Sequence, residues 1–216
     1  MQTKDHWMLA HHMLDRFPEF MDANRRTIQL NVDQKKKQID HPHYAGKRIV
    51  AINKSPRGLH RIAYLLGNVG PDFNPFTYLK RRRYEKPLAG HNYPNVEPYI
   101  QRETNRLQRI RHWNALDYFR AGRVIHYVAD SFTFPHNMGF RGGNKEHVDY
   151  EKQLHEVFPE YLEKFKAGLA QKEQHGLDVL HQGYERVCKK HVKAAVDSQF
   201  ILQAVHDAHL RLFHGR

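Results

Sequence analysis

Five side chains between residues 126 and 151 have the types and the spacing of metal ligands. His126 and Asp130 are four residues apart. His136 follows, and His147 and Glu151 form a second pair at the same spacing. Residues at positions i and i+4 of a helix share one face, with Cβ atoms about 5–6 Å apart, so each pair can converge on one cation. The pattern predicts two helices that fold back around a metal cluster.

A single pair of this kind would carry little weight, because the chain contains 18 histidines. One His-x-x-x-Asp pair is more often a surface pair or a buried hydrogen bond. Two such pairs with a histidine between them favour a metal site. The single cysteine, Cys188, excludes an intramolecular disulfide and a cysteine-based zinc site. The ligands must therefore be nitrogen and oxygen atoms, and imidazole and carboxylate bind Zn²⁺ at about 2.0–2.2 Å.

Clustered metal ions imply hydrolytic chemistry. They can lower the pKa of a bridging water from about 15.7 to about 7, which produces a nucleophile at neutral pH. Two ions about 3.5–4 Å apart can also stabilise both the attacking and the leaving oxygen of a phosphodiester. This reaction needs no serine or cysteine nucleophile, and the sequence shows no motif for one.

The composition and the net charge of the chain fit a phosphodiester substrate. The chain has 216 residues with a formal net charge of +12, and 40% of its residues are hydrophobic. The charge favours an anionic partner, which could be a phosphate-ester substrate, nucleic acid or an acidic membrane surface. No apolar run reaches the ~18 residues of a membrane span, and no secretory leader is visible. We expect a soluble, cytoplasmic protein.

The apolar periodicity predicts an all-α fold, a single-domain multi-helix bundle over residues 1–216. Asp5 is the expected cap of the first helix, and Ser55-Pro56 is a typical helix start. Five prolines and many aromatic residues predict a long loop at residues 70–98. The expected helices cover residues 5–24, 25–39, 55–67, 98–111, 114–132, 144–170, 176–190 and 192–213.

Three further motifs precede the ligand-rich stretch. They are His6 in DHWMLAHHML, Asp72 in GNVGPDFNP and His91 in AGHNY. In this order, residues 6–151 resemble the zinc-dependent phospholipase C family, which shares its fold with zinc-dependent nucleases that cleave single-stranded nucleic acid. The resemblance implies a helical bundle that holds two or three zinc ions.

The resemblance also implies three ligand sets. They are Asp72, His91, His126 and Asp130 for the first ion, His136, His147 and Glu151 for the second, and His6 with Asp130 as a bridge for the third. In the family, the α-amino group and carbonyl of an N-terminal tryptophan complete the third site. Here the chain starts at Met1, five residues before His6. Met1, Asp5 or water would therefore have to complete that site.

Further roles follow from the resemblance and from residue chemistry. By resemblance, Asp72 both binds metal and orients the attacking water as a general base. Phe73 could bind the substrate by a cation–π contact with a quaternary ammonium group. His11 and His12 compete with His6 for the ligand on the first helix. The basic run 80–83, Arg120 and Arg123 are either solvated or bind an anion.

These observations support three hypotheses. The first is a phospholipase C-type phosphoesterase that hydrolyses a phospholipid-like phosphodiester with a metal-activated water. The second is a zinc-dependent nuclease on single-stranded nucleic acid, which the positive charge suits. The third is a zinc-binding or anion-binding module without catalytic turnover.

Overall fold

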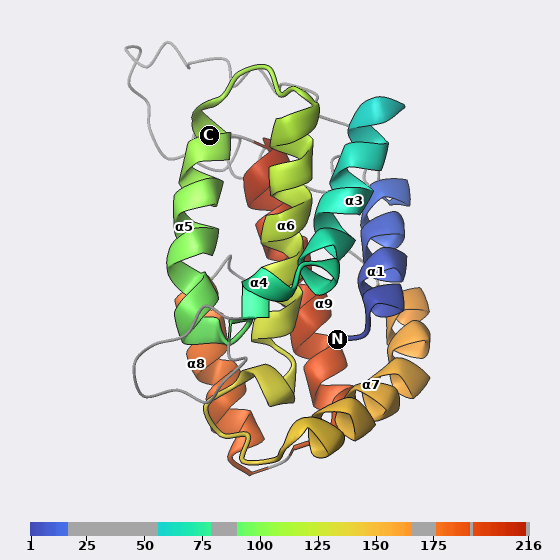
Figure 1. Cartoon of the computed structure of the whole chain (residues 1–216), viewed down its shortest axis with the longest axis vertical. Helices are drawn as coiled ribbons and strands as arrows, with labels where there is room; N and C mark the ends of the chain where they lie inside the picture. Colours follow the sequence, from blue (N-terminus) through green and yellow to red (C-terminus); the bar gives the residue numbers. More distant parts are fainter. Residues whose placement is uncertain (17–55, 79–89, 166–175, 191, 215–216) are drawn as a thin grey trace, which may run out of the picture.

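The computed structural model describes residues 1–16, 56–78, 90–165, 176–190 and 192–214 (Figure 1). These residues form α-helices and one short 3₁₀ helix, and no strand occurs among them. This confirms the predicted all-α class. No helix in these ranges combines the length and the apolar composition needed to cross a bilayer. The expectation of one domain over the whole chain stays a prediction.

Helix α6, Ala115–Ser131, lies at the centre of the fold (Figure 1). It begins where the sequence predicts, because Asn114 Oδ1 accepts from the Asp117 backbone N–H at 3.1 Å. The Asp117 side chain accepts in return from the Asn114 N–H at 3.2 Å, which completes a capping box. All residues from Val124 to Ser131 are buried. The part of the helix that carries His126 and Asp130 is therefore surrounded by protein.

The other helices surround α6 or extend the same core. Helices α1, α3, α5 and α9 pack directly against α6, whereas α7 packs against α9 and α1, and α8 packs against α9. Fully buried side chains from several helices, among them Leu9, Ile125 and Phe158, form one hydrophobic cluster. The bounds are α1 Thr3–Asp15, α3 Leu59–Phe73, α4 Pro75–Tyr78, α5 Tyr93–Arg109, η1 Phe134–His136, α7 Asn144–Lys164, α8 Leu177–Cys188 and α9 Ala194–His214.

Two glycines allow α3 and α6 to cross at backbone contact. A Cβ atom on Gly67 would lie 2.0 Å from the carbonyl oxygen of Phe119. A Cβ atom on Gly122 would lie 2.1 Å from the carbonyl oxygen of Tyr64. Any larger residue at either position would push the helices apart. The close crossing brings the C-terminal end of α3, with Asp72, beside the part of α6 that carries the predicted ligands.

The predicted loop at residues 70–98 is wrong over much of its length. Helix α3 continues through Gly67 to Phe73, the short α4 follows, and α5 begins at Tyr93. Gly67 serves helix packing and does not end the helix. Pro94 lies in the first turn of α5, where a backbone N–H would make no hydrogen bond within the helix, so proline is tolerated. The predicted helix at residues 25–39 and the basic run 80–83 lie outside the described residues.

The start of α1 also differs from the expectation. The helix begins at Thr3, so its N-cap is Gln2 and not Asp5. The Asp5 carboxylate accepts from the Gln2 backbone N–H at 3.2 Å from within the first turn. The helices predicted at residues 114–132, 176–190 and 192–213 agree with α6, α8 and α9 to within two residues at each end. Helix α5 begins at Tyr93, before the predicted start at residue 98, and α7 ends at Lys164, before the predicted end at residue 170.

The crossing of α3 and α6 can be tested by adding one methyl group. We expect Gly122→Ala to lower the free energy of unfolding by about 2 kcal/mol, because overpacking outweighs the better helix propensity of alanine. Gly183 in α8 is the matched control, since nothing lies within 4 Å of a Cβ placed there. Gly183→Ala should stabilise the protein by about 0.5–1 kcal/mol. Urea denaturation measures both, and a Gly122→Ala variant as stable as wild type would contradict the crossing.

Candidate metal centre

The eight residues predicted as ligands come together from five elements and one loop. The side chains form three groups, and within each group the candidate ligand atoms all lie within 4.8 Å of one another. The groups are His6, His126 and Asp130; Asp72, His91 and His126; and His136, His147 and Glu151. The last group has the same members as one ligand set that the resemblance implies. The other two differ in detail, because His126 belongs to both and Asp130 is grouped with His6 and not with Asp72 and His91.

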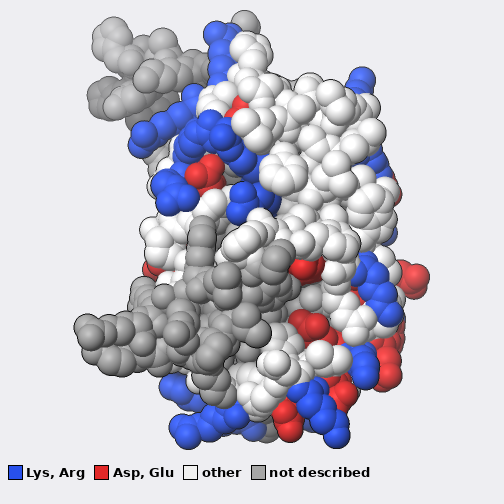
Figure 2. Space-filling model, viewed as in Figure 1, with Lys and Arg blue, Asp and Glu red and all other residues white. Residues whose placement is uncertain are grey.

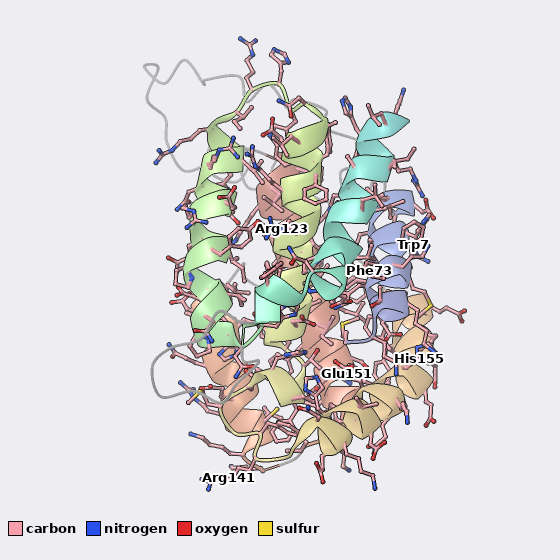
Figure 3. The ribbon with its side chains drawn as sticks, viewed as in Figure 1. Trp7, Phe73, Arg123, Arg141, Glu151 and His155 are labelled. Carbon is pink, nitrogen blue, oxygen red and sulfur yellow. The ribbon has the colours of Figure 1, made fainter. Side chains whose placement is uncertain are left out.

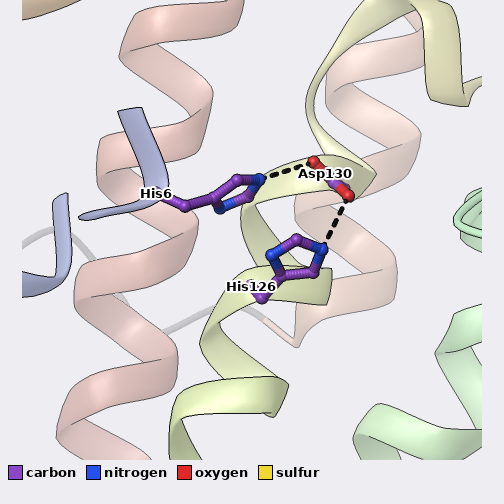
Figure 4. A group of neighbouring side chains, drawn as sticks. All are labelled: His6, His126 and Asp130. Atoms are coloured by element: carbon purple, nitrogen blue, oxygen red, sulfur yellow. Dashed lines mark hydrogen bonds and ion pairs between the residues drawn. The ribbon is translucent and has the colours of Figure 1, made fainter. Parts of the chain in front are cut away.

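Asp130 is the hub of this cluster. Its Oδ1 atom lies 3.1 Å from the α-amino nitrogen of Met1 and 3.1 Å from His6 Nε2. Its Oδ2 atom lies 2.9 Å from His91 Nδ1 and 3.2 Å from His126 Nε2. Figure 4 shows the carboxylate beside the rings of His6 and His126, with one oxygen contacting each ring. Burial opposes its ionisation, but the Met1 ammonium and the surrounding imidazoles hold the pKa of Asp130 well below its ordinary value.

The backbone of α3 sets the orientation of the His126 ring. His126 Nδ1 lies 2.7 Å from the carbonyl oxygen of Asn68, so Nδ1 carries the proton and donates it. Nε2 faces Asp130 Oδ2 at 3.2 Å and Asp72 Oδ1 at 3.6 Å. Burial lowers the pKa of His126, but Asp130 and Asp72 outweigh it and raise this pKa above its ordinary value. Within the described part of the chain, no atom meets Nε2 with the geometry of a hydrogen bond. In the neutral form of the ring, Nε2 carries the lone pair that a metal ion binds. A carbonyl that fixes the outer nitrogen in this way is common for histidines that bind metals.

His91 is oriented in the same way by a hydroxyl group. Its Nε2 atom lies 2.9 Å from Thr77 Oγ1. That hydroxyl lies 2.8 Å from the carbonyl oxygen of Pro71 and 2.7 Å from that of Asn74, either of which can accept its proton. In the tautomer that donates Nε2–H to the Thr77 oxygen, Nδ1 of His91 faces Asp130 Oδ2 without a proton, which is the form that binds a metal ion.

The third group joins α7 to η1. Glu151 Oε1 lies 3.1 Å from His147 Nε2, 3.6 Å from His136 Nε2 and 3.0 Å from the Met1 nitrogen. Burial lowers the pKa of His136 to about 4, so this imidazole is neutral at pH 7. Burial disfavours the charged form of Glu151 too, but the ammonium and the two imidazoles lower its pKa. Neutral imidazole and ionised carboxylate are the forms that bind a metal ion.

The predicted third site contains the side chains of His6 and Asp130, and further groups would have to complete it. His6 stacks on His126 with ring centroids 4.0 Å apart, and burial lowers the pKa of His6. Its Nδ1 atom is buried and has no hydrogen-bond partner among the residues that the structure describes. Of the groups expected to complete the site, the Met1 amino group lies beside Asp130, whereas the Asp5 carboxylate is engaged by His155 Nδ1 at 2.5 Å.

The α-amino group of Met1 lies among the candidate ligands, where it contacts Asp130 and Glu151. Burial disfavours its charge, but Asp130, Glu151 and Asp72 together raise the pKa of this amino group to about 11. It partly neutralises a space into which three carboxylates and several lone-pair nitrogens converge. The donor set therefore fits divalent ions that prefer nitrogen and oxygen ligands, of which zinc is one.

Asp72 and Phe73 lie at the edge of the cluster. Thr3 Oγ1 donates to Asp72 Oδ2 at 2.8 Å and fixes this carboxylate, which is only partly buried. Burial alone would raise the pKa of Asp72, but His126 and His6 lower it, so the carboxylate is ionised at neutral pH. The ring of Phe73, the next residue, is 73% exposed at the end of α3 (Figure 3).

Other candidates from the sequence lie apart from the three groups. His11 Nδ1 contacts Arg61 at 3.2 Å, and neither His11 nor His12 belongs to a group of potential ligands in the described part of the chain. Arg120 contacts Asp117 at 3.4 Å on the surface of α6. Arg123 lies over the ring of Tyr99, 5.2 Å from its centroid, and is half-buried.

Sequence reasoning missed Asp197, a buried carboxylate of α9. It accepts hydrogen bonds from the Phe134 backbone N–H at 2.7 Å, from Tyr150 Oη at 2.8 Å and from Tyr184 Oη at 2.8 Å. Phe134 begins η1, which carries His136, and Tyr150 adjoins Glu151 on α7. Asp197 therefore links the segments of the third group to α8 and α9. Its spacing from these partners shows no sequence pattern that could have indicated this role.

The described fold and these three groups define an all-α protein with a candidate centre for several metal ions. Residues 5–214 match the family described as zinc dependent phospholipase C. The chain belongs to this family, and the match supports a zinc-dependent phosphoesterase in general. Comparisons with curated proteins and with solved structures gave no match.

The buried Asp197 predicts a specific pH dependence of stability. Burial raises the pKa of Asp197 to about 6, despite its three donors, above the value of about 3.9 in an unfolded chain. The folded state thus binds more protons between these values, so the stability due to protonated Asp197 is present below about pH 4 and is lost as the pH rises through 6. We therefore compare the free energy of unfolding of wild type with that of Asp197→Asn. The value for wild type should fall by about 3 kcal/mol relative to the variant between pH 4 and pH 7.

Urea unfolding of both proteins across this pH range, with chelator present throughout, measures the difference. Asp178→Asn is the matched control, because Asp178 is exposed on α8. The control measures the effect of the same carboxylate-to-amide change at the surface of the protein. A pH-independent difference for Asp197→Asn would contradict the shifted titration.

Proposed function

We propose that the protein is a zinc-dependent phosphodiesterase that hydrolyses phospholipids by a phospholipase C reaction. One observation supports this above all: the inner nitrogens of His91 and His126 lie within 2.9–3.6 Å of the oxygens of Asp130 and Asp72 in the interior of the protein. Such a convergence of imidazole nitrogens and carboxylate oxygens suits metal ions, and the family supports zinc as the metal. The phosphodiester is the class of substrate that a cluster of such ions can hydrolyse.

We assign two or three ions to the three groups of side chains. The ligands would be Asp72, His91, His126 and Asp130 for one ion, His136, His147 and Glu151 for another, and His6 with Asp130 for the third. Zinc ions supply Lewis-acid chemistry there, because they polarise the phosphate ester and activate water at neutral pH. The Asn68 carbonyl and the Thr77 hydroxyl hold two of the imidazoles in the tautomer that binds.

The side chains at the exposed edge act on the substrate. Asp72, ionised and held by Thr3, orients the attacking water and accepts its proton as a general base. Phe73 provides an exposed ring beside this carboxylate, which suits contact with a lipid headgroup. The buried Asp130 stays ionised and balances the positive charge of the bound ions.

The role of Asp72 predicts a large loss of turnover in Asp72→Asn. We expect hydrolysis of phosphatidylcholine and of p-nitrophenyl phosphorylcholine to fall by about 10²–10⁴-fold, because the base is lost. Asp149→Asn, an exposed change on α7 beside Lys152, is the matched control and should keep wild-type activity. Native mass spectrometry separates loss of the base from loss of an ion. Full activity of Asp72→Asn would refute this role, and a zinc-loaded wild type inactive on every phosphodiester would refute the proposed function.

The assignment of ions predicts a change in stoichiometry. Wild-type protein should carry two or three zinc ions in native mass spectrometry, and His147→Ala should lose one of them. The expected loss is selective because, of the three groups, His147 contacts the members of the third alone, through Glu151 and the ring of His136. His112→Ala, a change outside the three groups, should leave the ion count unchanged. A wild type without zinc, or an unchanged count in His147→Ala, would contradict the assignment.

A second candidate is a nuclease on single-stranded nucleic acid. It is favoured by the exposed arginines on α5 and by the exposed rings of Phe73 and Phe76, since aromatic and basic side chains together suit stacked bases and phosphates. Degradation of single-stranded DNA without hydrolysis of phospholipid vesicles would select it. Strongly salt-dependent binding without any cleavage would instead indicate a module without turnover.

A further inference from the structure

Helix α3 exposes a stripe of large apolar side chains. The stripe consists of Leu59, Ile62, Leu66 and Phe73, whose exposed fractions lie between 52% and 73%. The spacings of three, four and seven residues place all four on one side of the helix. The opposite side, with Tyr64, packs into the core. Folding therefore does not need the stripe to be apolar.

Two neighbouring elements extend this surface. Trp7 on α1, which packs beside α3, is 43% exposed, and Phe76 on α4 is also exposed. Figure 2 shows a broad area with few charged side chains over the side where α3 and α1 lie. Monomeric soluble proteins rarely display large contiguous apolar patches unless a partner or a membrane binds there.

Basic side chains border the stripe. The ring of Phe119 on α6 lies against Gly70, 3.7 Å from the position of a Cβ atom there, so α6 adjoins the stripe directly. Arg120 and Arg123 follow Phe119 along α6, and Figure 2 shows a group of Lys and Arg side chains over α5 and α6 beside the area with few charges. The acids within this group, Glu103 and Asp117, are buried against arginines.

The stripe also leads to the candidate metal centre. Phe73, its last residue, directly follows Asp72, and Figure 3 shows Phe73 at the end of α3 nearest to Glu151. A surface that binds the apolar stripe would therefore lie at the exposed edge of the cluster. The reacting phosphate of a phospholipid lies at the membrane surface. A membrane bound to the stripe would therefore bring this phosphate close to the candidate metal centre.

We propose that this face docks on a phospholipid bilayer that contains anionic lipids, with the apolar stripe at the boundary of headgroups and acyl chains and the arginines at the phosphates. The proposal rests on the proposed function, whose substrate would lie in that bilayer. An interfacial helix face of this composition binds through apolar burial and through attraction to anionic lipids. A two-fold contact between copies fits less well, because it would bring the same basic border of both chains together.

The test is binding of the zinc-loaded protein to vesicles of phosphatidylcholine with roughly one third phosphatidylserine. We expect the triple variant Leu59→Gln, Ile62→Gln and Leu66→Gln to partition about tenfold more weakly than wild type. Wild type should also bind more weakly to vesicles of phosphatidylcholine alone. The matched control is Val179→Gln with Val192→Gln, two exposed apolar residues outside the stripe, and it should bind as wild type does.

Turnover of the soluble substrate p-nitrophenyl phosphorylcholine separates docking from catalysis. The triple variant should hydrolyse it at the wild-type rate, because none of the three residues touches the candidate centre. Unchanged vesicle binding of the triple variant, a parallel loss of soluble turnover, or a wild-type dimer that the triple variant dissociates in sedimentation would each overturn the proposal. Vesicle binding that depends on the stripe in a protein without turnover would support docking and refute only the proposed function.

Discussion

The structure depends on one carboxylate in an apolar interior. Asp130 lies in the buried C-terminal part of α6, where an isolated negative charge is strongly disfavoured. It stays ionised because an ammonium group and several imidazoles surround it. Apart from His126 of α6 itself, these groups come from the N-terminal segment with α1, from the segment before α5 and from η1, so the charge of Asp130 links these segments to α6. Metal ions placed among the same atoms would strengthen this arrangement, since they satisfy lone pairs that face each other.

The close packing of α3 on α6 fixes the orientation of the imidazole rings around Asp130. Because Gly67 and Gly122 remove side chains from the crossing, the carbonyl of Asn68 comes within hydrogen-bond distance of His126. That contact selects the tautomer whose second nitrogen faces the carboxylates. Thr77 does the same for His91 from the short helix that follows α3. The orientation of the candidate ligands thus follows from backbone packing as much as from the ligands themselves.

The sequence predicts the residues of the cluster better than it predicts their supports. The i, i+4 pairs identify the faces of α6 and α7 because helical periodicity alone fixes which side chains lie together. The grouping of Asp72, His91 and His6 with them follows from the resemblance and agrees with the geometry, while their roles as ligands stay predictions. Asp197, Thr77 and the Asn68 carbonyl could not be predicted, because their contacts join distant segments and involve residue types found everywhere. The predicted end of the helix at residue 67 was wrong for the same reason, since the helix that packs on Gly67 lies far along the chain.

The hydrogen bonds of Asp197 have a consequence for motion. One side chain holds η1, α7 and α8 against α9, so these segments share a common anchor on the far side of the third group. Regions that share such an anchor tend to open together as a cooperative unit in native-state hydrogen exchange. The amide protection of α8, which contributes no candidate ligand, would then report on the integrity of the centre from outside it.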